Sequence, residues 1–589
     1  MAQKVQLSTK NSTPIPGSDI LIESLLRHDV DTVFAYPGGC AIPMHQSLTR
    51  YRGQVRVILP RHEQGGGFAA QGYARATGKV GVCMTTSGPG ATNAVTAIAD
   101  AKLDSIPTLF ITGQVGTGVI GTDAFQETPI VEVCRSITKQ HYLVTDVNDI
   151  AQVMNEAFYV ASSGRPGPVL VDLPKNVQND LAVPNFDSPV ELPGYSFDGL
   201  SASDEEITAL ADMIDAAERP IFYVGGGIVS SEASESLREL VKKANVPVTT
   251  TLMALGVIAA NDPLWLGMPG MHGSVYANEA VHNCDLIITL GARFDDRVTG
   301  ALSTFAPHAK IAHIEIDRSE VNKVRKADLA IVADVGDVIS RLCKKVKKAK
   351  IDDWHKQIAD WKKSDPLTYD KNYPDILAQH AVETLSKLTQ KFDPILTTGV
   401  GQHQMWAAQF FEHQAPRRHL TSGGLGTMGF GLPAAMGAKA ACPEKLVLCI
   451  EGDGSILMNM QEMATCFCEE IPIKVLLLNN QHLGMVMQWE DRFYQMNRAH
   501  TYLGPVHHPE WAGDGDGKSP ATRYPDFVGI ARGFGWGGKS IFSKNELEGA
   551  IQEMIESKGS YLLDVQVPYQ EHVLPMIPAG TSIAEMIKE

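Results

Sequence analysis

The segments Lys445–Ser455, KLVLCIEGDGS, and Ile473–Asn480, IKVLLLNN, decide how this chain folds. Each contains a run of Val, Leu and Ile residues that is as long as one β-strand. The first run ends in Gly-Asp-Gly, the second ends in Asn-Asn, and we expect a helix between them over Ile456 to Glu469. Strand, turn, helix and strand in this order predict a βαβ unit of a parallel sheet.

Asp453 and Asn480 directly follow the two predicted strands. The carboxyl ends of neighbouring parallel strands lie at one edge of a sheet, where ligands bind. Mg²⁺ takes six oxygen ligands and uses one or two carboxylates beside phosphates, so these side chains and the carbonyl of His482 suit it. Glycines beside Asp453 and a helix N-terminus after Ser455 favour a phosphate at the same place. The two segments therefore predict a magnesium and diphosphate site.

A second Gly-Asp-Gly at 515–517, within WAGDGDGKSP, offers a comparison inside the same chain. No strand-like run precedes this copy, and no Asn-Asn follows it. We interpret it as a solvated loop. The strand context, and not the three letters, distinguishes Asp453.

Strand-like runs recur at helix-length intervals along the whole chain, which predicts an α/β fold with three doubly wound parallel-sheet domains. Residues 183–202 are rich in Pro, Asp and Ser and are predicted to be a linker. Residues 346–375, which end in Pro-containing turns, are predicted to be a second linker. The predicted domains are then 13–182, 203–345 and 376–589, the last with a C-terminal tail.

The composition is that of an ordinary globular protein, with 589 residues, 44% hydrophobic and 20% charged. A net charge of -16 argues against nucleic acid or a membrane surface as a partner. No apolar run reaches the ~18 residues of a membrane span. The N-terminus shows no targeting pattern, so we expect a cytoplasmic location, or a plastid one if a transit peptide has been removed. The nine scattered cysteines lack a C-x-x-C pair and predict reduced thiols.

Four further motifs accompany the diphosphate segments: RHEQGG at 61–66, TSGPGATN at 86–93, GTDAFQE at 121–127 and QHLGMVMQWE at 481–490. Together they resemble the catalytic subunit of acetohydroxyacid synthase (acetolactate synthase), a thiamine-diphosphate-dependent family. The resemblance covers nearly the whole chain in the family's domain order, which is pyrimidine-binding, FAD-binding and diphosphate-binding.

The resemblance implies an enzyme that decarboxylates pyruvate on thiamine diphosphate and ligates the remaining hydroxyethyl unit to a second 2-ketoacid. The acceptor is pyruvate, which gives 2-acetolactate, or 2-ketobutyrate, which gives 2-aceto-2-hydroxybutyrate. This reaction is the first common step of valine, leucine and isoleucine biosynthesis. The implied cofactors are thiamine diphosphate, Mg²⁺ and FAD.

The resemblance also implies roles for single residues. Glu63 activates the cofactor through its aminopyrimidine ring, although from the residues alone a Glu that caps the following helix is equally consistent. Gln126 and Gly39 lie close to the reacting centre, and Met428 is the apolar wedge that bends the cofactor. Trp489 favours 2-ketobutyrate as acceptor, an effect of ~1 to 3 kcal/mol for one methylene. For Met428 and Trp489, ordinary core packing is the alternative.

Three sets of binding residues follow from the resemblance. The residues implied to contact thiamine diphosphate are Glu63, Gly401, Gln402, His403, Gly426, Met428, Asp453, Gly454, Ser455, Asn480, His482, Leu483, Gly484 and Met485. Those implied to contact FAD are Arg165, Gly225, Gly226, Gly227, Thr251, Leu252, Met253, Gly270, Met271, His272, Gly291, Arg293, Asp295, Arg297, Glu315, Ile316, Asp334 and Val335. Those implied to line the substrate channel are Phe125, Lys139, Lys175, Arg297 and Trp489.

In the family, Glu63 of one subunit serves the cofactor that Asp453 of another subunit binds, so a homo-oligomer with sites at the dimer interface is implied. A dimer or a tetramer, and a small regulatory subunit as a further partner, stay open. The alternatives are pyruvate oxidase, pyruvate decarboxylase, glyoxylate carboligase or an inactive flavoprotein scaffold. Glu63 argues against glyoxylate carboligase, whose counterpart lacks this carboxylate, and Gln126 with Trp489 favours ligation.

Three departures from the family pattern bear on the channel. Gly116-Thr117-Gly118 stands where the family often has proline, so we expect a more mobile loop. Cys40 and Ala579 also occupy positions near the channel. The segment 505–519 is longer than usual and receives no role.

Overall fold

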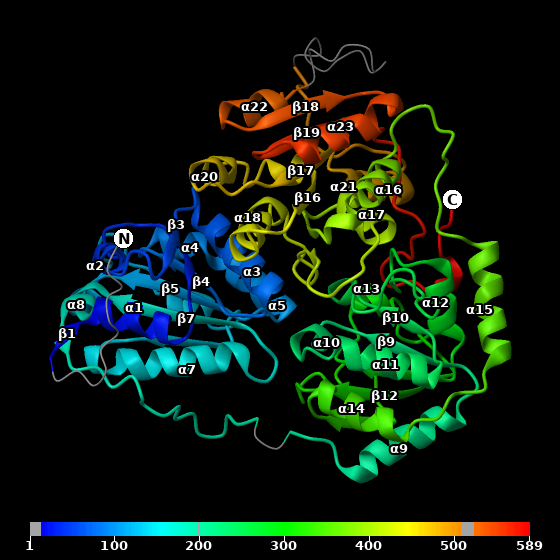
Figure 1. Ribbon diagram of the computed structural model, residues 1–589, viewed down its shortest axis with the longest axis horizontal. Helices are drawn as coiled ribbons and strands as arrows, with labels where there is room; N and C mark the ends of the chain where they lie inside the picture. Colours follow the sequence, from blue (N-terminus) through cyan, green and yellow to red (C-terminus); the bar gives the residue numbers. More distant parts are fainter. Residues whose placement is uncertain (1–12, 198–199, 508–523) are drawn as a thin grey trace.

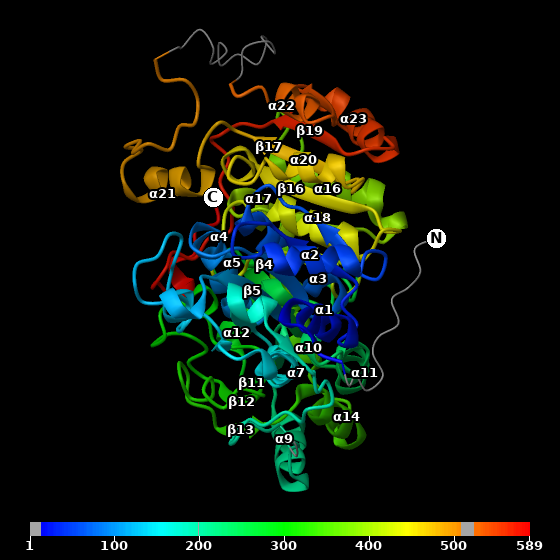
Figure 2. The same ribbon diagram turned by 90° about the vertical axis from the view of Figure 1, so that its left-hand side faces the viewer.

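A computed structural model describes residues 13–197, 200–507 and 524–589. The chain forms three α/β units, each built around a parallel sheet (Figure 1; Figure 2). The first unit is blue to cyan, the central unit green, and the last yellow to red. The predicted fold class is confirmed. The second Gly-Asp-Gly, at 515–517, and most of the segment 505–519 lie outside the described residues.

The N-terminal and C-terminal sheets share one topology. Their strand orders are β3-β2-β4-β5-β7-β6 and β15-β14-β16-β17-β19-β18, so each reads 2-1-3-4-6-5 by order of appearance. The N-terminal strands are β2 (Thr32–Ala35), β3 (Arg56–Ile58), β4 (Gly81–Thr85), β5 (Thr108–Gln114), β6 (Gln140–Leu143) and β7 (Pro168–Pro174). The C-terminal strands are β14 (Ile395–Thr398), β15 (His419–Leu420), β16 (Val447–Gly452), β17 (Lys474–Asn479), β18 (Gly537–Ile541) and β19 (Tyr561–Gln566).

The central sheet has the order β10-β9-β11-β12-β13. Its strands are β9 (Pro220–Val224), β10 (Val248–Thr250), β11 (Leu286–Leu290), β12 (Lys310–Glu315) and β13 (Leu329–Val332). In all three sheets the first and third strands are neighbours, and the chain leaves them in opposite directions. A crevice for ligands opens at such a switch point, beyond the carboxyl ends of the strands.

Two helices pack face to face between the N-terminal and C-terminal sheets: α3 (Glu63–Thr77) and α18 (Gly431–Ala441). A Cβ atom on Gly72 would overlap the carbonyl of Ala434, and one on Gly437 would overlap that of Ala69. Only glycine permits this approach. Because 72 lies beside 434 and 69 beside 437, the two helices run antiparallel, and their N-termini point to opposite ends of the interface.

The two predicted linkers differ. The described residues between Val183 and Ala202 contain no helix or strand, and in Figure 1 they run as an extended segment from the first unit to the central one. The segment 346–375 instead contains the helix α15 (Asp352–Ser364). Trp354 and Ile358, one turn apart, are buried against the central unit, and Trp354 Nε1 donates to the Pro220 carbonyl at 3.2 Å. This buried face makes the segment part of the fold.

The predicted helix from Ile456 to Glu469 is also wrong in detail, because the structure has α19 (Asp453–Ile456) and α20 (Glu462–Cys468). Between them, the buried Asn459 side chain donates to the Gly429 carbonyl at 2.9 Å. A side chain fixed in this way offers the backbone an alternative to a continuous helix. In the described part of the chain, no helix is long and apolar enough to cross a membrane.

Candidate active site

Asp453 and Asn480 directly follow two neighbouring strands, as predicted. Strands β16 and β17 pair in parallel with Gly452 opposite Leu478, so the residues that follow both strands emerge at one edge. Asp453 is only 4% exposed and its Oδ1 accepts from the Gly454 N–H at 2.9 Å. Its Oδ2 has no partner among the described residues, and burial raises the pKa of Asp453 to about 7.

This carboxylate fits a metal ligand, because a buried oxygen without a partner is costly and a bound cation would satisfy it. No group of three acidic, His or Cys side chains that could hold a metal occurs in the part of the chain that the structure describes. A cation held by one carboxylate, an amide, a carbonyl and phosphates agrees with that finding, and Mg²⁺ prefers such a set.

A tight turn follows Asn480. Its Oδ1 accepts from the His482 N–H at 2.9 Å, while the His482 ring nitrogen Nδ1 lies 2.8 Å from the Asn480 carbonyl oxygen. Gln402 Oε1 faces this turn and accepts from Asn480 Nδ2 at 3.5 Å. A Cβ atom on Gly454 would lie 2.8 Å from Leu483 Cδ2, 3.2 Å from Leu503 Cδ1 and 3.5 Å from Met428 Cε, so three apolar side chains flank the Asp453 loop.

The residues from Gly401 to His403 come to the same edge. They follow β14 and begin α17 (Gln402–Phe410), and β14 is the switch-point neighbour of β16. The His403 ring lies against Gly452, where a Cβ atom would be 2.7 Å from its Nδ1. Burial lowers the pKa of His403 to about 3, so this imidazole is neutral. The structure thus brings Gln402, His403, Asp453 and Asn480 to one edge of the sheet, and their role at a diphosphate stays a prediction.

A second buried acid, Glu451, was missed by the sequence reasoning. Its side chain is fully buried, its Oε1 accepts from the Leu432 N–H at 3.0 Å, and burial raises its pKa to about 7. It therefore joins the base of the Asp453 loop to the N-terminus of α18. Its position two residues before Asp453 was a visible signal.

The N-terminal unit assembles a separate group of predicted residues. Glu63 is the first residue of α3, is 8% exposed, and its Oε2 accepts from Asn93 Nδ2 at 2.9 Å. Thr86 packs against Gly38, the residue that precedes Gly39. A Cβ atom on Gly39 would meet nothing within 4 Å, so this residue borders open space.

Gln126 and Phe125 belong to the loop after β5. Gln126 has a left-handed backbone, with φ of 60°, and its carbonyl lies against Gly88 after β4. Phe125 is 88% exposed, so most of its ring is open to solvent in a single chain.

An unpredicted side chain from the other unit holds the backbone before Glu63. Glu462, at the start of α20, accepts from the N–H groups of Arg61 and His62 at 3.0 and 3.1 Å. Thr465 Oγ1 donates to the same carboxylate at 2.7 Å, and burial raises the pKa of Glu462 to about 7. The C-terminal unit thus fixes the approach to Glu63.

Within one chain, Glu63 lies far from the Met428 loop. Arg75, near the other end of α3, donates to the Thr421 carbonyl at 2.9 Å, and its guanidinium lies 5.0 Å from the Phe430 ring. The twelve helical steps from Glu63 to Arg75 span about 18 Å. The Glu63 group and the Met428 loop therefore lie at opposite ends of α3.

In the central unit, the implied FAD residues gather at the switch point between β9 and β11. Gly227 and Gly291 approach closely, since a Cβ atom on Gly227 would lie 2.7 Å from the Gly291 Cα, and the Gly227 N–H donates to the Gly291 carbonyl at 2.9 Å. Met253 packs against Gly226 and also reaches Gly423 of the C-terminal unit. A backbone without side chains at this edge suits a nucleotide.

Other implied FAD residues have protein partners in the structure. Arg165 Nη1 pairs with Asp317 at 3.1 Å and Glu320 at 2.8 Å, which ties the first unit to the central one. Asp334 is the N-cap of α14 (Val335–Lys345) and accepts from the Gly336 N–H at 2.8 Å. Asp334 therefore has a structural role that needs no ligand.

Three of the implied channel residues come from three different units: Lys175 from the first, Arg297 from the central one and Trp489 from the last. Trp489 lies on α21 (Gly484–Phe493), with its ring 4.9 Å from that of Phe493. Lys175 is exposed at the carboxyl end of β7, and the Arg297 side chain is 60% exposed.

Lys139 does not lie with the other channel residues. Its backbone N–H bonds to Pro168, at the amino end of β7, and its Nζ donates to the Val160 and Ser163 carbonyls at 2.5 Å each. Burial lowers the pKa of Lys139 to about 7. Within this chain the ammonium closes the end of α7 (Ile150–Ser162) at the opposite edge of the sheet, and the channel role of Lys139 stays a prediction.

Comparisons with known proteins agree with this geometry. Three family models match: the N-terminal thiamine pyrophosphate (TPP) binding domain over 15–133, the thiamine pyrophosphate enzyme central domain over 207–342, and the C-terminal TPP binding domain over 399–565. Acetolactate synthase 3, chloroplastic, of Brassica napus is 51% identical over 584 residues, which are 98% of this chain and 87% of the relative. Acetolactate synthase 1, chloroplastic, of Zea mays is 52% identical over 581 residues, 98% of this chain and 89% of the relative. The Arabidopsis thaliana enzyme is 50% identical over 583 residues, 98% and 85% of the two chains.

Proposed function

This chain belongs to the acetolactate synthases, and from this premise we propose how its residues divide the work of the reaction. It is the catalytic subunit of an acetohydroxyacid synthase, a thiamine-diphosphate-dependent carboligase. The observation that carries the division of roles is the buried, unpartnered Oδ2 of Asp453 at the C-terminal switch point, at the opposite end of α3 from Glu63.

In this proposal, Asp453, Asn480 and the His482 carbonyl hold Mg²⁺ and through it the diphosphate. Gln402 and the neutral His403 line the diphosphate from the neighbouring strand. Met428 and Leu483, which flank Gly454, provide an apolar support for the rings. These residues bind and orient, and they move no proton.

Thiamine diphosphate, when bound, supplies the acidic carbon that adds to pyruvate and accepts the electrons released by decarboxylation. The chain contributes Glu63, a buried carboxylate whose recorded partner is the neutral amide of Asn93. In this proposal Glu63 would exchange a proton with a ring nitrogen of the bound cofactor. Gly39 leaves room at the reacting centre, and Gln126 contributes a polar side chain.

FAD binding is proposed for the central unit. The support is the close approach of Gly227 and Gly291 at the β9–β11 switch point, together with Thr251 and Met253 at the same edge. In this proposal Arg165 exchanges part of its ion pairs for the cofactor. Asp334, already used as a helix cap, is the weakest member of the set.

We further propose that two chains build each active site. The antiparallel α3 and α18 point the catalytic edges of their sheets toward opposite ends of the interface. A second copy related by a two-fold axis brings its Glu63 edge to this chain's Asp453 edge, and the contact is then the same on both copies. The exposed Phe125 lies on the edge that such a partner covers.

This arrangement is tested by combining two inactive variants. We expect Glu63→Gln and Asp453→Asn each to be inactive alone. A hybrid of the two, purified with a different tag on each chain, is expected to regain ~50% of wild-type activity, because one of its two sites then carries no substitution. If both residues served one site within a chain, both sites of the hybrid would be damaged and no activity would return.

Trp489 is proposed to select the acceptor. Its indole lies on α21 beside Phe493, near the Asn480 turn, and a rigid wall there gains from the extra methylene of 2-ketobutyrate. With both 2-ketoacids present, we expect Trp489→Leu to lower the ratio of 2-aceto-2-hydroxybutyrate to 2-acetolactate by about 10- to 100-fold. Phe392→Leu, a change of an exposed aromatic far along the chain from α21, serves as the control. An unchanged product ratio in Trp489→Leu would remove it as the selector.

The cellular location and the regulatory subunit stay predictions. The chain was expected in the cytoplasm, with a plastid as the alternative. The names of the relatives carry the word chloroplastic, which favours the plastid alternative.

A further inference from the structure

A cluster of three buried charged side chains lies between the first and last units, outside the residues assigned above. Arg75 comes from α3, and Asp100 and Asp104 come from one face of α5 (Val95–Asp104). Arg75 Nη2 lies 2.8 Å from Asp104 Oδ2 and 3.4 Å from Asp100 Oδ2, and the three side chains are at most 4% exposed. Gln71 accepts from the same guanidinium at 2.9 Å. One cation here faces two carboxylates.

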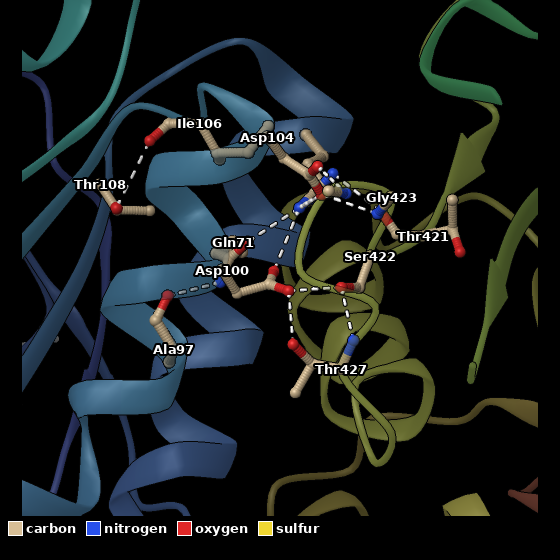
Figure 3. Close-up of polar contacts among 12 residues, drawn as sticks. Gln71, Ala97, Asp100, Asp104, Ile106, Thr108, Thr421, Ser422, Gly423 and Thr427 are labelled. Carbon is tan, nitrogen blue, oxygen red and sulfur yellow. Dashed lines mark hydrogen bonds and ion pairs between the residues drawn. The ribbon is translucent and has the colours of Figure 1, made fainter. Parts of the chain in front are cut away.

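Both carboxylates are directed at the loop from Thr421 to Met428, where they meet Ser422, Gly423 and Thr427 (Figure 3). Asp104 accepts from the N–H groups of Gly423 and Gly424 at 3.0 and 2.6 Å. Asp100 accepts from the Ser422 hydroxyl, and from the Thr427 hydroxyl at 2.8 Å. With the bond from Arg75 to the Thr421 carbonyl, five hydrogen bonds join the cluster to this loop.

The loop needs such support because of its composition. It contains no helix or strand, and Gly426 and Gly429, on either side of Met428, have φ of 69° and 82°. Glycines in this region lose more conformational freedom on folding than other residues, so the loop is costly to fix in one form. Asp100 restrains it next to Met428, directly through the Thr427 hydroxyl and indirectly through Ser422, whose oxygen accepts from the Thr427 N–H at 2.8 Å.

We propose that Asp100, Asp104 and Arg75 are positioning residues that hold the Thr421–Met428 loop and thereby fix the Met428 wedge against the cofactor. The proposal rests on the proposed function in one respect, the role of Met428. The cluster belongs to the N-terminal unit and the wedge to the C-terminal one. Proper packing of the two units in one chain is therefore a condition for bending the cofactor.

The test compares three variants and one control. Asp100→Asn and Asp104→Asn remove one charge each. Thr427→Val removes only the hydroxyl that donates a hydrogen bond to Asp100. Thr427→Val leaves all three buried charges in place, so it is expected to fold even if the Asp variants do not. Glu23→Gln is the matched control, since Glu23 is also buried in the first unit, with Tyr51 Oη at 3.0 Å and Arg27 at 3.6 Å, but lies on α1 (Gly17–Arg27), away from the loop.

The first measurement is amide hydrogen exchange of the peptide 421–428 in protein without cofactor. We expect Thr427→Val to speed this exchange about 3- to 10-fold, the size of one lost hydrogen bond, and the Asp variants to speed it more. Glu23→Gln is expected to leave the peptide unchanged. Unchanged exchange in every loop and cluster variant would overturn the proposal.

The second measurement follows the bound cofactor. Near-ultraviolet circular dichroism depends on the angle between its two rings, and we expect a weaker band in the variants, with kcat lowered about 3- to 30-fold while the Mg²⁺-dependent affinity for thiamine diphosphate changes less. Faster exchange with unchanged dichroism and kcat would mean that the cluster only joins the two units, and would overturn a positioning role. Met428→Ala tests the proposed role of Met428 separately from the role of the cluster. If this variant leaves the dichroism band and kcat unchanged, Met428 is not the wedge, and the exchange result for the loop still stands.

Discussion

Replacing Glu63 by Gln is expected to lower kcat by about 10²- to 10⁴-fold, the usual contribution of a positioned general acid or base. Gln keeps the size of the side chain and an oxygen that Asn93 Nδ2 can donate to, so the local packing at the start of α3 should survive. Only the ability to exchange a proton is lost. Steady-state kinetics with pyruvate at saturating cofactor measures the change.

The same variant should bind thiamine diphosphate nearly as well as the wild type. The residues proposed to hold the diphosphate, Asp453 and Asn480, lie at the opposite end of α3 from Glu63. Calorimetric titration with the cofactor and Mg²⁺ checks this expectation. Glu132→Gln, on an exposed acid of the same unit that pairs with Arg135, is the control and should change kcat by less than about two-fold. Full activity in Glu63→Gln would leave Glu63 as a helix-capping residue and nothing more.

The arrangement of the two half-sites follows from topology more than from any single residue. The first and last sheets share one strand order, and in each the proposed site residues lie at the carboxyl edge near the switch point. Their contact through antiparallel glycine-containing helices sets these edges at opposite ends. In the proposed assignment, a single chain therefore carries the Glu63 edge and the Asp453 edge at opposite ends of the interface, which is why an oligomer is proposed.

The central strands of each sheet could be predicted because they are buried on both faces. Strand β17, for example, is buried along its whole length, and its four central residues, 475–478, are an unbroken apolar run. Some strands at the sheet edges carry no such signal. Strand β18 has the sequence GGKSI, and it becomes a strand only because it pairs with β19.

The same difference applies to the site. Asp453 and Glu63 stand in local motifs that suggest their chemistry, and the structure finds both buried. Glu462 carried no comparable signal, because its partner Arg61 lies 401 residues away in the sequence. The Asp100 cluster is equally non-local, since its carboxylates meet a loop more than 300 residues later. Contacts of this kind depend on how the units pack, and a single sequence does not contain that information.

The break between α19 and α20 shows a local misreading of a different kind. The residues from Ile456 to Glu469 have helix length, but Asn459 and its bond to Gly429 interrupt the backbone pattern. Asn is a residue whose side chain competes with the backbone for hydrogen bonds. Its position within the predicted helix, at the end of the first turn, was the available warning.

Replacing Asp453 by Asn is expected to weaken cofactor binding, whereas Glu63→Gln is expected to lower kcat with cofactor binding nearly unchanged. Asn keeps an oxygen for the Gly454 N–H but removes the negative charge that a cation needs, so we expect affinity for Mg²⁺ and thiamine diphosphate to fall at least about 100-fold. Near 100 times its Kd, a ligand stabilises the folded protein by about 2.7 kcal/mol, and a 100-fold weaker affinity removes most of that.

Thermal unfolding with and without the cofactor measures this loss directly. Without cofactor, Asp453→Asn should be as stable as the wild type or more stable, because the variant no longer buries a carboxylate oxygen that lacks a partner. With cofactor and Mg²⁺, only the wild type should gain stability, and chelation of Mg²⁺ by EDTA should abolish that gain. Asp516→Asn, in the second Gly-Asp-Gly, is the matched control and should retain wild-type cofactor affinity. If Asp453→Asn binds the cofactor like this control, Asp453 is not the metal ligand, and the strand context that distinguishes the two copies has no functional meaning.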